Sequence, residues 1–247
     1  MTRIRTLLRR WRRAIRDVVL IVVGVLIALA ANAWWQTRED QERARAYVAQ
    51  LLADVRENEL ELRSAFQVDS TTADGMQRLL SALDRVSAPP RDSLRMWMQR
   101  PPVFYSNPRP RLGTVDALIE TSDIRLFRDE RLRSAVIAYA SAMEEEQAEA
   151  SRAVDVLMEG GLLLARRFRD AGLPTVRPGP DGRFRAATLD RLTDGFATSW
   201  PAIRSDPQVF EALLNATVGY ASRVSSLEAM LNATMQLRRL LESGDAP

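Results

Sequence analysis

The side chains of this chain that can take part in acid–base or electrostatic chemistry are carboxylates, tyrosines, hydroxyls and arginines, because histidine, cysteine and lysine are absent. These absences exclude a Ser-His-Asp triad, a cysteine nucleophile, a zinc finger and a P-loop. A pair of carboxylates can hydrolyse a glycoside, but no stretch here is typical of the shaped cleft such an enzyme needs. We therefore expect no catalytic residue, bound metal or cofactor, and keep a carboxylate-based cell-wall hydrolase as an alternative.

Acidic side chains cluster in two segments. One group is Glu144, Glu145, Glu146 and Glu149, and the other is Glu57, Glu59 and Glu61 with Arg63. Carboxylates four residues apart share a helical face and repel each other, unless a positive charge or a hard cation lies nearby. We favour a plain solvated helix face for both groups.

The positive charge of the chain is concentrated at its beginning. Residues 1–17 contain one acid, Asp17, and the seven arginines Arg3, Arg5, Arg9, Arg10, Arg12, Arg13 and Arg16, for a net charge of +6. The rest has 28 arginines and 31 acids, or −3, so the domain is mildly acidic and a nucleic-acid partner is not expected.

An apolar segment follows the arginines. Val18 to Ala31 is apolar throughout, and with Asn32, Ala33, Trp34 and Trp35 the segment reaches 18 residues. As a helix it would be about 27 Å long, close to the hydrocarbon thickness of a bilayer. Trp11, Trp34 and Trp35 would lie near the two headgroup levels as interface anchors, and the arginines would place the N-terminus in the cytoplasm, with contact to anionic lipid. The sequence therefore predicts a transmembrane helix at 18–35.

Two other interpretations of this segment stay open. A basic start, a short apolar stretch and Ala31-Asn32-Ala33 also fit a cleaved signal peptide, which would still export the domain. A buried core helix is disfavoured, because seven nearby arginines have no place in a core. The apolar residues between the arginines fit an amphipathic helix on the inner leaflet, or the arginines act as a topology signal alone.

Small residues share one face of the predicted span. Gly24, Ala28, Ala31 and Asn32 are spaced so that two helices could approach closely, with the asparagine bonding across the pair. This face predicts helix pairing, with a second copy or a partner. Ordinary membrane use of small residues, with Asn32 reaching headgroup water, also explains the pattern, and of the two explanations we favour this one.

The remainder, residues 36–247, reads as helices separated by proline-rich loops near 87–113 and 172–205. Apolar spacings of three and four predict a stalk helix to about residue 67 and a second helix capped by Ser70 or Thr71. A short helix is expected around Leu94–Met98, and another from Thr114 to Thr121. A long helix should follow Asp129, weakened at Gly160-Gly161, and the last should start at Ser205 or Asp206 with Pro207. We predict an all-α fold, a transmembrane helix continuing into a stalk and an antiparallel, coiled-coil-like bundle.

Two blocks resemble a family of uncharacterised bacterial single-span membrane proteins. In the first, Asp17, Gly24, Leu26, Ile27, Ala28, Leu29, Asn32, Trp34, Tyr47, Leu51, Leu52, Asp54 and Asn58 match its acidic residue, Gly-x-Leu-Ile-Ala-Leu run, Asn-x-Trp and following charged helix. In the second, Leu118, Ile119, Ser122, Leu126, Leu132 and Tyr139 match leucines around a Ser-Gly turn, with Asp123 in place of the glycine. The resemblance implies a span and a helical domain, and brings no known activity.

These observations favour an inner-membrane protein with one span, a cytoplasmic N-terminus and a periplasmic helical domain. We expect the bilayer and a protein partner or second copy as its contacts, and a role as scaffold or accessory subunit of a cell-envelope complex. The main alternative is a sensor that binds a small ligand between helices and signals through a partner, because 17 cytoplasmic residues are too few for a signalling domain.

Overall fold

The computed structural model describes residues 2–101, 103–170, 173, 183 and 185–243, with side chains from residue 20 onward except residue 21. The elements in chain order are α1 (Thr2–Ala82), α2 (Arg91–Trp97), α3 (Gly113–Glu120), the 3-10 helix η1 (Asp123–Leu126), α4 (Glu130–Asp170), α5 (Ala186–Thr198), α6 (Trp200–Ser205) and α7 (Pro207–Glu242). Every regular element in these residues is a helix, which confirms the all-α prediction.

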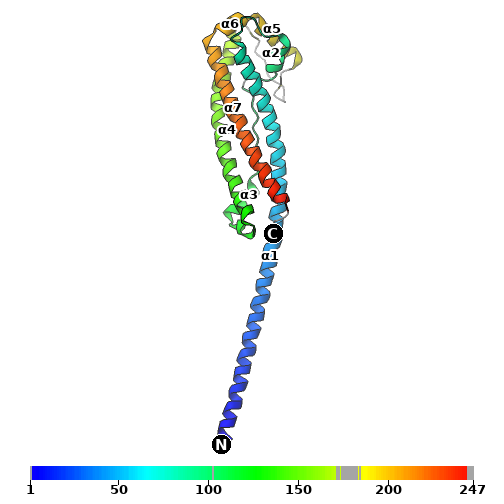
Figure 1. Ribbon diagram of the computed structural model, residues 1–247, viewed down its shortest axis with the longest axis vertical. Coiled ribbons are helices and arrows are strands. Elements are labelled where there is room, and N and C mark those ends of the chain that lie inside the picture. The colour runs from blue at the N-terminus through cyan, green and yellow to red at the C-terminus, as the bar shows by residue number, and fades with distance from the viewer. Residues whose placement is uncertain (1, 102, 171–172, 174–182, 184, 244–247) are drawn as a thin grey trace.

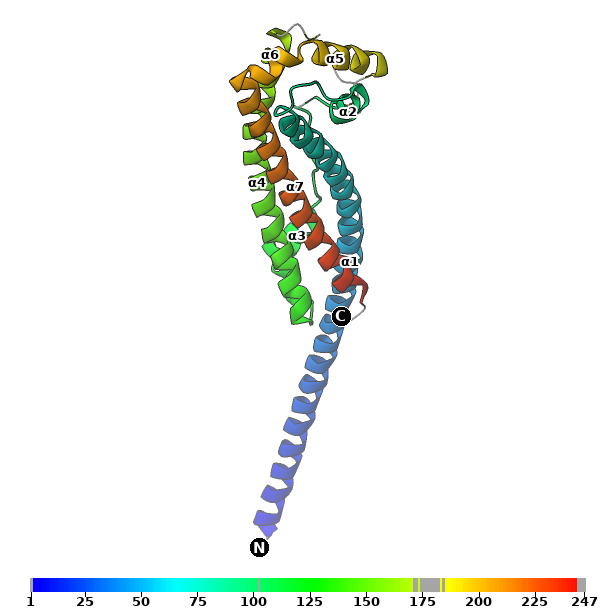
Figure 2. The same ribbon diagram turned by 45° about the horizontal axis from the view of Figure 1, so that its top comes forward.

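The long helices α1, α4 and α7 lie side by side, with α7 in the middle (Figures 1 and 2). The chain rises along α1 to the end opposite the N-terminus, here called the distal end, where α2, α5 and α6 lie. Residues 103–112, here called the return segment, then run back to α3 without forming a helix. As a result α1 and α4 point the same way, and α7, which contacts both, runs antiparallel to each of them.

Helix α1 continues past the break predicted near residue 67. Ser70 and Thr71 do not cap a new helix, because the hydroxyl of Thr71 donates to the carbonyl of Gln67 and that of Thr72 to the carbonyl of Val68. A hydroxyl bonded four residues back is compatible with an uninterrupted helix. The first described side chains of α1, from residue 20 to residue 39, are all exposed, and the first buried one is Ala44.

Capping residues stand at the start of the other two long helices, α4 and α7. Asp129 accepts from the backbone N–H of Arg131 at 2.8 Å, and Asp206 accepts from that of Gln208 at 2.9 Å, with Pro207 in the first turn. Both caps were predicted. Thr114 does not cap α3, because its hydroxyl donates to Asp54 instead. Residues 186–205, expected as part of a loop, form α5 and α6.

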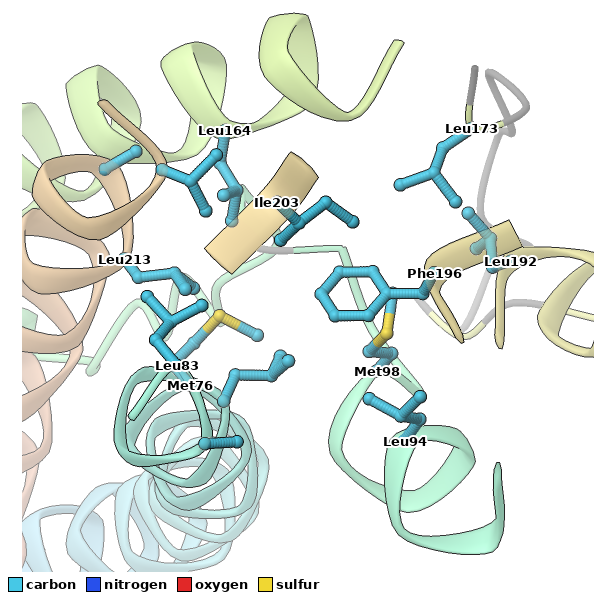
Figure 3. Packing of buried hydrophobic residues seen from close by; sticks show 14 of the residues in the cluster. Met76, Leu83, Leu94, Met98, Leu164, Leu173, Leu192, Phe196, Ile203 and Leu213 are labelled. Carbon is cyan, nitrogen blue, oxygen red and sulfur yellow. The ribbon is translucent and has the colours of Figure 1, made fainter. Parts of the chain in front are cut away.

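Two separate hydrophobic clusters hold the helices together. The proximal cluster, nearer the N-terminus, joins Leu62 of α1, Tyr139 of α4 and Leu227 of α7 with α3 and Phe127. The distal cluster joins Met76, Leu157 and Leu213 with the small helices, and Figure 3 shows Phe196 among Met98, Leu94 and Ile203. The amphipathic spacing of Leu189, Leu192 and Phe196 explains why α5 forms, since all three are buried there.

Glycines permit a close contact between α4 and α7. A Cβ atom added to Gly160 would lie 2.6 Å from the carbonyl oxygen of Ala212 and 2.7 Å from the nitrogen of Ala216. One added to Gly219 would lie 2.8 Å from the backbone nitrogen of Leu157. Helix α4 runs unbroken through Gly160 and Gly161, and Gly160 lies at a close contact with α7, where we had expected a weak point.

Candidate functional site

Acceptors on α1 hold the backbone of the return segment. Because this segment has no secondary structure, its backbone groups need partners from elsewhere in the fold. Asp69 accepts from the N–H of Ser106 at 2.9 Å, and Glu61 accepts from that of Arg109 at 2.7 Å. Pro108 and the other prolines of the segment have no N–H to satisfy. The register is antiparallel, since later residues of the segment meet earlier residues of α1.

Asn58 forms the next step of this arrangement and is fully buried. Its side chain accepts from the N–H of Arg111 at 2.7 Å and donates to the carbonyl of the same residue at 2.9 Å. It also donates to the Tyr139 hydroxyl at 3.0 Å, and burial raises the pKa of that tyrosine. Asn58 therefore ties together α1, the return segment and α4.

The solvated-face interpretation fails for Glu59 of α1, whereas Glu57 and Glu61 are exposed as predicted. The Glu59 side chain is only 5% exposed and lies 2.6 Å from Arg238 of α7 and 2.8 Å from Arg63. Glu61 binds a backbone N–H, as described above. In the second acidic group, Glu149 contacts Arg152 at 2.5 Å, which lowers the pKa of Glu149, while Glu144 and Glu145 are exposed. Among the described residues, no group of three or more acids could hold a metal ion.

A buried ion pair lies between the two hydrophobic clusters. Arg223 of α7 donates from Nε to Asp69 of α1 at 3.1 Å, and their side chains are 4% and 0% exposed. Arg223 also donates to the carbonyl of Ala150 on α4 at 3.2 Å and to that of Ser106. Its guanidinium lies 4.7 Å from the ring centre of Tyr105. One side chain thus connects all three long helices and the return segment.

Burial is the main influence on the pKa values of Asp69 and of the nearby Tyr220. It raises the pKa of the Asp69 carboxyl, although Arg223 and the N–H of Ser106 both act to lower it. It also raises the pKa of Tyr220, whose hydroxyl donates to the carbonyl of Phe104. Desolvation of the two charges therefore offsets much of their attraction, as is common for buried pairs.

Beside the ion pair of Arg223 and Asp69 lies an open cleft of about 480 Å³. Residues 105 and 107–110 of the return segment form one wall, residues 147, 150, 151, 154 and 155 of α4 form another, and Arg223, Leu227 and Met230 of α7 complete it. Neither the cleft nor the ion pair was predicted from the sequence. A signal was present, because Asp69 stands in a seven-residue spacing with Leu62, Met76 and Leu83, and such a position normally holds an apolar residue.

The predicted pairing face of the span lies on the part of α1 that projects away from the domain (Figure 1). Gly24, Ala28, Ala31 and Asn32 are all exposed, and an added Cβ at Gly24 would meet nothing within 4 Å. Trp34 and Trp35 are 61% and 65% exposed. Trp11 and the seven arginines belong to the helical backbone of α1, but their side chains lie outside the described residues.

In the part of the chain that the structure describes, no helix has a stretch long and apolar enough to cross a membrane. The predicted span at 18–35 begins with residues whose side chains lie outside that description, and it stays a prediction.

The two blocks of the family resemblance contact each other. Asn58 bonds to Tyr139, and the Tyr47 hydroxyl donates to Asp123 at 2.9 Å. In the second block the left-handed backbone conformation falls on Ser122, with φ of 61°, which leaves Asp123 free to bind Tyr47. The chain matches no family model, no curated protein and no solved structure. Membership of the resembling family therefore also stays a prediction.

Proposed function

We propose that this chain is a single-span protein of the bacterial inner membrane, with its N-terminus in the cytoplasm and residues 36–247 in the periplasm. In this proposal the helical bundle is the interaction or scaffold subunit of a cell-envelope complex. The observation that carries the anchor is the exposure of apolar side chains along the projecting part of α1. Exposed fractions between 47% and 71% are found for Leu20, Val22, Val23, Val25, Leu26, Ile27 and Leu29.

These side chains are distributed around the helix, which distinguishes them from an amphipathic stripe. A helix that is apolar on every side is unstable in water and is buried in protein or in lipid. No described helix packs on this stretch, so lipid is the environment that we propose for it. The arginines that precede it supply the orientation through the positive-inside rule.

Replacing Leu26 by arginine tests the anchor, with Leu60→Arg as its matched control. Both leucines are exposed residues of α1, at 59% and 70%, but only Leu26 belongs to the proposed span. An arginine at the centre of a span costs about 2.5 to 3.5 kcal/mol of insertion free energy. We expect the native chain and Leu60→Arg to resist carbonate extraction from membranes, and Leu26→Arg to be extracted more readily. A native chain found in the supernatant would refute the anchor.

An apolar stripe on α7 supports the interaction role. Phe210, Leu214 and Val218 are 50%, 40% and 52% exposed, and their spacing of four residues puts them on one face of the distal half of α7. Contiguous exposed apolar surface of this kind is typical of protein contacts. The stripe does not belong to either hydrophobic cluster.

We expect a photoreactive amino acid in place of Val218 to give one discrete crosslinked product in intact cells. A second copy of the chain or a specific membrane partner would each fit, and the mass of the product distinguishes them. The same amino acid in place of Gln236, which is also exposed on α7 but lies near its other end, should give none. Equal labelling from both positions, or none from positions 210, 214 and 218, would contradict the interaction role.

A further inference from the structure

We propose that the cleft between the return segment, α4 and α7 binds a small zwitterion with an apolar side chain, of the class of an aliphatic α-amino acid. This inference goes beyond the anchoring and interaction roles and does not depend on either of them. The volume of about 480 Å³ is within the range of small-molecule sites, about 300 to 1,000 Å³.

The floor of the cleft is held in place before any ligand arrives. Arg223 lines the cleft while bound to Asp69 and to the carbonyls of Ala150 and Ser106, and the ring of Tyr105 lies against its guanidinium. The return segment is in turn fixed to α1 by Glu61 and Asn58. A site built from groups that are already ordered avoids part of the entropy cost of binding.

Two unpaired opposite charges line the cleft from different walls. Arg109 comes from the return segment and Asp155 from α4, and both are exposed. Within the described residues no ion pair engages either side chain. The neighbouring charges, in contrast, are paired. Arg152, one turn before Asp155, contacts Glu149, and Arg223 contacts Asp69. The cleft therefore offers one site for a carboxylate and one for an ammonium group, the two charges of a zwitterion.

Apolar side chains supply the third element of recognition. Leu227 and Met230 of α7 and Val154 of α4 line the same cleft. Leu227 and Met230 are nearly fully buried, at 1% and 2% exposed, so the apolar surface that a ligand can reach comes mainly from the half-buried Val154, Pro108 and Pro110. A ligand whose two charges reach Arg109 and Asp155 would cover this surface with its side chain, which favours an aliphatic residue over a small polar one.

Three matched probes test the assignment on the full chain in detergent, by isothermal titration calorimetry. L-Leucine has both charges, 4-methylpentanoate has only the carboxylate, and 3-methylbutylamine has only the ammonium group. We expect L-leucine to bind at least about tenfold more tightly than either of the others, since each charge-assisted contact contributes about a factor of ten or more.

Two variants then assign the charges. Arg109→Gln should reduce the affinity for L-leucine to that for the amine, and Asp155→Asn should reduce it to that for the carboxylate. Arg125→Gln, at an exposed arginine of η1 outside the cleft, should leave binding unchanged. No binding of L-leucine, equal binding of the three probes, or leucine binding that neither cleft variant weakens would each overturn the proposal.

Discussion

Replacing Arg223 by methionine is expected to lower the free energy of unfolding by about 3 to 5 kcal/mol, because it leaves the carboxylate of Asp69 buried without its counter-charge. The carbonyl of Ser106 loses a donor in the same step. The measurement is urea denaturation of the detergent-solubilised chain, followed by circular dichroism. Arg152→Met, which breaks the exposed contact with Glu149, is the control and should cost less than about 1 kcal/mol.

Removing both charges of the pair separates their attraction from their desolvation. Asp69→Leu with Arg223→Met leaves no buried charge, although Ser106 still loses partners for its N–H and carbonyl. We expect the double variant to be about 2 kcal/mol more stable than Arg223→Met alone, because an apolar side chain replaces the uncompensated buried carboxylate. A double variant less stable than the single one would show that the carboxylate is favourable even without the arginine.

The difference in unfolding free energy between the native chain and the double variant should depend on pH. Burial raises the pKa of Asp69 above its ordinary value of 3.8, so the folded chain binds this proton more tightly than the unfolded chain does. The stability contributed by the proton is complete below pH 3.8 and is lost as the pH rises through the folded-state pKa. The native chain should therefore lose stability relative to the double variant as the pH is raised across this interval.

Replacing Gly160 by alanine is expected to destabilise the chain by about 2 to 3 kcal/mol, although alanine is the better helix former by about 1 kcal/mol. The added methyl group would meet backbone atoms of Ala212 and Ala216, which can move only if α4 and α7 separate. The same denaturation measurement applies. Gly113→Ala is the matched control, because an added Cβ there meets nothing within 4 Å and should cost nothing. Stabilisation by Gly160→Ala would mean that the two helices do not cross this closely.

The sequence predicted the features of this fold that depend on local chemistry. The caps formed by Asp129 and Asp206 follow from the preference of a carboxylate for the free N–H groups at a helix start. The helix start predicted at Ser70 or Thr71 was wrong because a threonine hydroxyl can cap a helix or bond back within it, and the nearby residues do not distinguish the two. The difference is set by the packing of α1 against α7, which is not local.

The buried polar groups could not be assigned because their partners are far away in the chain. Glu61 looks like an ordinary surface acid until the N–H of Arg109, 48 residues later, is placed beside it. Arg223 follows Tyr220 by three residues and precedes Leu227 by four, which is an apolar position of a heptad pattern. A charge at such a position indicates a buried partner of opposite sign, but it does not identify Asp69 among the many acids.

The continuity of α1 has a consequence for how the domain is oriented. One helix of 81 residues, about 120 Å long, contains both the projecting segment and the residues that hold the return segment. The number of residues between the projecting segment and the return-segment contacts therefore sets the direction in which the cleft faces around the axis of α1. Deleting one of residues 36–42 would turn the whole domain by about 100° around the helix axis relative to the projecting segment, whereas deleting all seven would return it nearly to its starting direction.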